Sequence, residues 1–172
     1  MNDRASTLLG GRRERIERVL GRELGQPSAA SSEPLPRTNR IYLLDEAKDL
    51  YWNELEWENL MDEEAVDEGP LTELIFPGFL TYVRGLMLRE VMPDAKAPAN
   101  PRPQVVEDIL VFLAGRVVAL EERMAGPDEE SQARLTFERD ATAHLLDLTL
   151  YVFHELTPEE IERVEADRQP SP

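Results

Sequence analysis

Apolar residues recur at helical spacing along most of this chain, and no segment alternates between apolar and polar residues as a strand would. Residues 104–125 are the clearest case, because their apolar positions advance in steps of three and four. These positions are Val106, Ile109, Leu113, Val117, Leu120 and Met124. The pattern predicts an all-α fold.

Three further segments carry the same period. Residues 41–61 present a wide apolar face, and residues 77–92 form a helix that Pro77 can begin. Residues 131–156 are apolar nearly all round in their second half, so we expect this helix at the centre of the bundle. The apolar positions there are Leu145, Leu146, Leu148, Leu150, Val152 and Phe153.

A short C-terminal helix is predicted by its first residues. Thr157 suits the N-cap position, Pro158 the first helical position, and Glu160 the position that hydrogen-bonds back to the cap. The predicted fold class is therefore a compact all-α bundle of four main helices plus this short one. Antiparallel packing of neighbouring helices is the expected arrangement.

The first 40 residues differ from the rest. Residues 11–24 form a short amphipathic helix rich in arginine, whereas residues 25–40 are rich in proline and serine and have no apolar period. We therefore expect a detached basic arm (1–24), a flexible linker (25–40), an acidic helical domain (41–168) and a frayed tail (169–172).

The arm has two interpretations. It can bind the phosphates of a nucleic acid or an anionic surface of a protein or membrane, or it can stay solvated or fold back on its own acidic domain. If it binds a partner, the candidate residues are Arg12, Arg13, Arg15, Ile16, Arg18, Val19, Leu20 and Arg22.

Charge separates the arm from the domain. The chain carries −16 in all; eight arginines against five acidic residues give the first 40 residues +3, which leaves −19 for the rest. A domain this acidic should repel nucleic acid and attract a basic protein surface. The simpler interpretation of the acidic run after residue 50 is a solvated helix face. The candidate partner-binding residues are Trp52, Glu54, Glu56, Glu58, Asp62, Glu63 and Glu64, whereas Trp57 fits the core face.

Several chemistries find no support in the sequence. The absence of cysteine excludes disulfides and thiolate metal sites, and no nucleophile motif, phosphate-binding glycine loop or His-Glu-x-x-His motif occurs. The one metal candidate is the stripe Asp140, His144 and Asp147, which is more typical of an ordinary polar helix face. We expect no cofactor and no catalysis.

The sequence thus favours a non-catalytic accessory or adaptor protein. Its acidic domain and basic arm would dock on a larger protein assembly, as linked contacts. Two alternatives stay open: an acidic nucleic-acid mimic that inhibits a DNA- or RNA-binding protein, and a carboxylate- and histidine-based metal protein or enzyme. No apolar run reaches the length of a membrane span or resembles a signal peptide, so we expect a cytoplasmic location.

Overall fold

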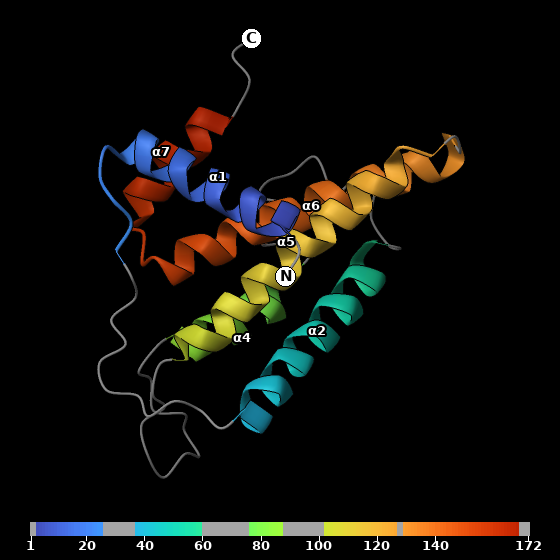
Figure 1. The fold of residues 1–172 in the computed structure, drawn as a ribbon, viewed down its shortest axis with the longest axis horizontal. Helices are drawn as coiled ribbons and strands as arrows, with labels where there is room; N and C mark the ends of the chain where they lie inside the picture. Colours follow the sequence, from blue (N-terminus) through green and yellow to red (C-terminus); the bar gives the residue numbers. More distant parts are fainter. Residues whose placement is uncertain (1–2, 26–36, 60–75, 88–101, 127–128, 169–172) are drawn as a thin grey trace.

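The computed structural model describes residues 3–25, 37–59, 76–87, 102–126 and 129–168. Within these ranges every regular element is an α-helix, which confirms the predicted all-α bundle. The helices, shown in Figure 1, are α1 (Asp3–Leu20), α2 (Arg37–Asn59), α4 (Pro77–Met87), α5 (Pro103–Met124), α6 (Glu129–Phe153) and α7 (Pro158–Arg168).

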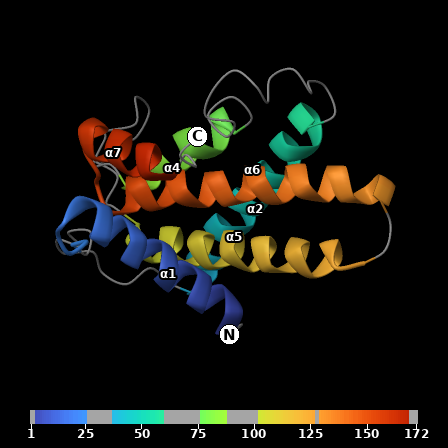
Figure 2. The same cartoon turned by 90° about the horizontal axis from the view of Figure 1, so that it is seen from above.

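An antiparallel hairpin of α5 and α6 forms the centre of the bundle. The two helices run side by side along most of their length (Figures 1 and 2). Helices α2 and α4 pack on one side of this hairpin, and α1 packs against α5 and α7 on the other. The central position of α6 was predicted, because both its faces are apolar: Leu145, Leu146 and Leu150 are completely buried.

The other predicted apolar faces also lie in the core. On α2 the buried residues are Ala47, Tyr51 and Leu55, and on α4 they include Phe79 and Val83. Helix α4 begins at Pro77, as expected for a residue that needs no hydrogen-bond partner for its nitrogen there. The predicted core position of Trp57 lies outside the residues whose side chains are described.

The start of α2 differs from the prediction by one turn. The apolar pattern begins at Ile41, but the helix begins at Arg37. Arg40 explains part of this difference, because its guanidinium binds both carboxylate oxygens of Asp108 on α5, with N–O distances of 2.5 and 2.6 Å. This contact holds the first turn of α2 against the hairpin.

The predicted detachment of the N-terminal helix is wrong. Helix α1 begins at Asp3 rather than residue 11, ends at Leu20, and buries Ala5, Leu9, Ile16 and Leu20 in the common core. Gly21 ends it with a φ of +69°, a conformation that glycine adopts without strain. The correct interpretation of the arm in this structure is the fold-back alternative, because its arginines find acidic partners on α5, α6 and α7.

Candidate interaction surfaces

One face of α2 points into solvent and combines acidic with large apolar side chains. Ile41, Asp45, Asp49, Trp52 and Glu56 are all exposed, and their steps of four, four, three and four residues place them on one stripe. Tyr42 and Asn53 are exposed beside it. We call this set the α2 outer face: Ile41, Tyr42, Asp45, Asp49, Trp52, Asn53 and Glu56.

The apolar members of the α2 outer face are unusually accessible for their size. Tyr42 is 62% exposed, Ile41 48% and Trp52 41%, and among the described large apolar residues only Val111 on α5 joins them as exposed. No ion pair joins Asp45, Asp49 or Glu56 to another residue in the described ranges. The face therefore presents both net negative charge and apolar contact area to solvent.

Trp52 is held in place from beneath. The guanidinium of Arg116, on α5, lies 4.6 Å from the centre of the Trp52 ring, a cation–π contact. Arg116 in turn donates to Glu138 on α6 over 3.3 Å, and Glu138 is buried. The Tyr51 ring packs edge-on against Trp52 at 5.0 Å. An exposed aromatic side chain fixed in this way loses little conformational entropy when it binds a partner.

Two of the seven residues predicted for domain docking lie on this face, namely Trp52 and Glu56. Glu54 does not: it is half-buried, and its carboxylate lies against Gly78, where an added Cβ would come within 2.1 Å of Oε1. The side chain of Glu58 and all of Asp62, Glu63 and Glu64 lie outside the described residues. The helical period of the exposed positions adds Asp45 and Asp49, which the search for dense acids did not select.

The arm arginines contact the chain's own acids and carbonyls. Arg12 pairs with the buried Asp147 on α6, and Arg13 donates to Glu107 on α5 over 2.9 Å. Arg15 donates to the carbonyl of Val164 on α7 over 3.0 Å. Of the predicted arm residues, Ile16 and Leu20 are buried and Val19 is half-buried, and only Arg18 is both exposed and without an ion pair in the described ranges.

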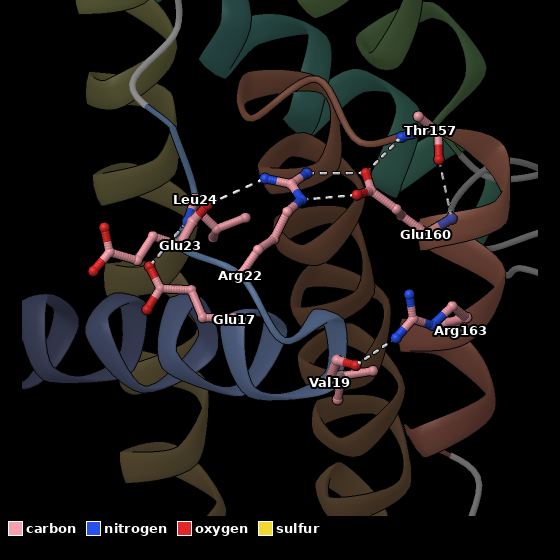
Figure 3. A network of polar contacts seen from close by, with 8 residues as sticks. All are labelled: Glu17, Val19, Arg22, Glu23, Leu24, Thr157, Glu160 and Arg163. Atoms are coloured by element: carbon pink, nitrogen blue, oxygen red, sulfur yellow. Dashed lines mark hydrogen bonds and ion pairs between the residues drawn. The ribbon is translucent and has the colours of Figure 1, made fainter.

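Figure 3 shows how the end of α1 joins the start of α7. Arg22 donates from Nε and from one terminal nitrogen to the two carboxylate oxygens of Glu160, over 2.8 and 3.0 Å. Glu160 also accepts from the amide of Thr157 over 3.0 Å, and its own amide donates to the Thr157 hydroxyl over 3.2 Å. The predicted capping box is thus confirmed. Arg163 adds a bond of 3.0 Å to the carbonyl of Val19.

The negative charge of Glu160 strengthens its hydrogen bonds both with Arg22 and with the amide of Thr157. The hydrogen bonds from Arg22 hold the pKa of Glu160 below its ordinary value, and the amide of Thr157 lowers it further. Glu160 therefore stays ionised to lower pH than a free carboxyl group, and one side chain caps α7 while it holds α1.

His154 lies where α6 ends, and its two ring nitrogens contact Arg13 on α1 and Gly25 just after the arm. Nε2 accepts a hydrogen bond from Arg13 Nε over 3.1 Å, because a guanidinium is only a donor. The proton of the neutral ring therefore lies on Nδ1, which donates to the carbonyl of Gly25 over 3.0 Å. Burial lowers the pKa of His154, and the charge of Arg13 lowers it further, whereas the Gly25 carbonyl, Glu107 and Glu17 act in the opposite direction.

The predicted metal stripe is not brought together. Asp140 is exposed and pairs with Arg139, Asp147 is buried against Arg12, and Nε2 of His144 lies 3.6 Å from Glu165. Among the residues that the structure describes, no three His, Cys, Asp or Glu side chains are grouped closely enough to hold a metal ion. Asp140 instead pairs within α6, whereas Asp147 contacts α1 and His144 lies near α7.

Within the described ranges, no helix combines the length and the apolar character that a membrane crossing requires. Comparison with known proteins gives no match to a protein-family model, to a curated protein or to a solved structure.

Proposed function

We propose that this chain is a non-catalytic accessory or adaptor protein that docks on a basic protein surface through the α2 outer face. The observation that carries the proposal is a supported, exposed Trp52 between the carboxylates of Asp49 and Glu56. Aromatic side chains in a desolvated centre supply much of the binding energy at protein interfaces, and surrounding charges favour a partner of opposite sign.

The geometry suits a partner that follows the helix. Asp45 and Glu56 are eleven residues apart, so the acidic stripe extends about 16 Å along α2. A basic helix or strand of the partner can place two or three cations along that length and still cover Trp52. Nucleic-acid mimicry calls for a longer double row of charges, so we favour the adaptor function.

Capture from native lysate at low and moderate salt tests this function. The first variant reverses the acidic stripe, with Asp45→Lys, Asp49→Lys and Glu56→Lys together, and the matched control variant reverses three exposed carboxylates on other helices. The control changes are Glu14→Lys, Glu121→Lys and Glu162→Lys, which alter the net charge equally.

We expect a salt-sensitive partner that the control retains and the stripe variant loses. Trp52→Ala should weaken the same partner by about 30-fold, the effect of an interface anchor worth about 2 kcal/mol. Equal retention by the stripe and control variants would refute docking through α2. A partner that added DNA or RNA displaces would favour the nucleic-acid mimic instead.

A further inference from the structure

We propose that α1 is a pH-controlled arm, docked on the bundle while His154 is neutral and released when His154 takes up a proton. This proposal concerns a different side of the molecule from the α2 outer face and does not depend on the function assigned to that face. It rests on the two hydrogen bonds that join the His154 ring to Arg13 and to Gly25.

The docked geometry requires a neutral imidazole. Arg13 Nε donates to Nε2, so protonation of Nε2 would remove the acceptor and place a second cation 3.1 Å from the guanidinium. The bond from Nδ1 to the Gly25 carbonyl survives protonation, because Nδ1 is already a donor. The His154 ring packs edge-on against the Phe153 ring, with 4.8 Å between the ring centres. The guanidinium of Arg13 lies 5.6 Å from the centre of the Phe153 ring. The added proton therefore breaks one of the contacts that hold Arg13, whose other partners are the carboxylate of Glu107 and the ring of Phe153.

The charged groups around His154 come from two neighbouring helices. Arg13 and Glu17 lie on α1 and Glu107 lies on α5, and these are the charges among the described residues that act on the ring. The two carboxylates favour a protonated ring, but each already accepts a hydrogen bond. Glu107 binds Arg13 over 2.9 Å, and Glu17 accepts from the amide of Leu24 over 3.2 Å. Burial of the ring and the charge of Arg13 therefore prevail.

Release would change what the protein presents to a partner. When α1 is docked, all its arginines except Arg18 are paired with acids of α5, α6 and α7. When α1 is released, these arginines form a basic amphipathic segment that can bind an anionic protein surface. The pH window follows from linkage. The released state has an ordinary histidine pKa of about 6.5 and the docked state a lower one, so the released fraction rises as pH falls below about 6.5. The ratio of released to docked protein gains up to about tenfold per pH unit until the docked pKa is reached.

Spin-label distances measured between pH 8 and pH 5 test the proposal in the full chain, which contains no native cysteine to interfere. Labels at Glu14→Cys and Glu121→Cys report α1 against α5, and labels at Asn53→Cys and Glu121→Cys report α2 against α5 as the control pair. NMR titration of the two imidazoles gives the protonation midpoint of His154, and the variant His144→Gln identifies which signal belongs to it.

We expect the α1 distance to broaden with the same midpoint as the His154 titration, while the control distance stays fixed. His154→Gln, which does not titrate in this range, should abolish the transition. The proposal is overturned if His154 titrates without any change in the α1 distance, or if the transition persists in His154→Gln. If that variant does not fold, agreement or disagreement between the two midpoints in the protein with native His154 decides the question alone.

Discussion

Replacement of Arg12 tests whether α1 belongs to the folding unit. Arg12 occupies the apolar stripe of α1 between Leu9 and Ile16, and it pairs with Asp147, whose side chain is only 2% exposed. Arg12→Leu keeps apolar volume at the site but removes the paired guanidinium from a buried carboxylate. The loss of one partner from a buried pair destabilises a protein strongly, so we expect the free energy of unfolding to fall by about 3 kcal/mol.

The reverse change should cost less. Asp147→Leu leaves Arg12, whose side chain is 20% exposed and can turn its guanidinium towards water, so we expect a loss of about 1–2 kcal/mol. The double variant Arg12→Leu/Asp147→Leu should return to within about 1 kcal/mol of the native protein, because two apolar side chains of similar size can replace a buried ion pair.

Urea denaturation followed by circular dichroism measures these differences, with the slope m checked for constancy. Arg4→Leu is the matched control: it also removes an α1 arginine from an ion pair, but Arg4 and Glu122 are 59% and 58% exposed. We expect that control to lose no more than about 0.5 kcal/mol. If Arg12→Leu cost no more than Arg4→Leu, or if the double variant cost the sum of the two singles, the buried pair would not fasten α1.

Three further predictions concern the junction of α6 and α7. Glu155 has a φ of +54° and forms the C-terminal cap of α6, so Glu155→Gly should stabilise the protein by about 1 kcal/mol in urea denaturation, whereas Glu155→Ala should not. Thr157→Ala should cost about 1 kcal/mol in the same assay, and Thr157→Ser, which retains the capping oxygen, should cost much less. Stability should also fall in acid in two stages. Below about pH 6.5 the unfolded chain takes up a proton at His154, whereas the folded chain does not, because its His154 pKa is lower. Below about pH 4.5 the same difference arises at Glu160, whose pKa is also lower in the folded chain. In unfolding midpoints measured over a pH series, His154→Gln should remove only the first stage.

The features that the sequence predicted well depend on near neighbours. The apolar steps of α5 fix its buried face because they repeat within one helix, and Ile109 and Leu113 are completely buried as expected. The capping box of α7 involves only Thr157, Pro158 and Glu160, so four consecutive residues contain all the necessary information.

The docking of α1 on the bundle could not be predicted from residues that are close together in the sequence. Arg12 and Asp147 are 135 residues apart, and Arg13 and His154 are 141 apart, so the partners that turn a basic helix into a buried one lie on distant helices. The pattern on α1 itself is ambiguous, because Arg12 stands on the stripe where an apolar residue was expected. An analysis of apolar periodicity counts every arginine as polar. It therefore cannot distinguish an arginine in solvent from one that pairs with a buried carboxylate on another helix.

The same distinction decides which part of the negative charge is available for binding. Five acids on α5, α6 and α7 form ion pairs with arginines of residues 4–22, and these are Glu107, Glu122, Asp147, Glu160 and Asp167. Their charge is largely neutralised where they stand. The carboxylates of the α2 outer face have no such arginines opposite them, so their field extends into solvent. Among the described residues, Asp45, Asp49 and Glu56 are exposed and unpaired together on one helix face beside Trp52, whereas the exposed Glu14, Glu121 and Glu162 lie on three different helices. For this reason reversal of three charges on α2 should matter far more than reversal of three elsewhere, although both changes alter the net charge equally.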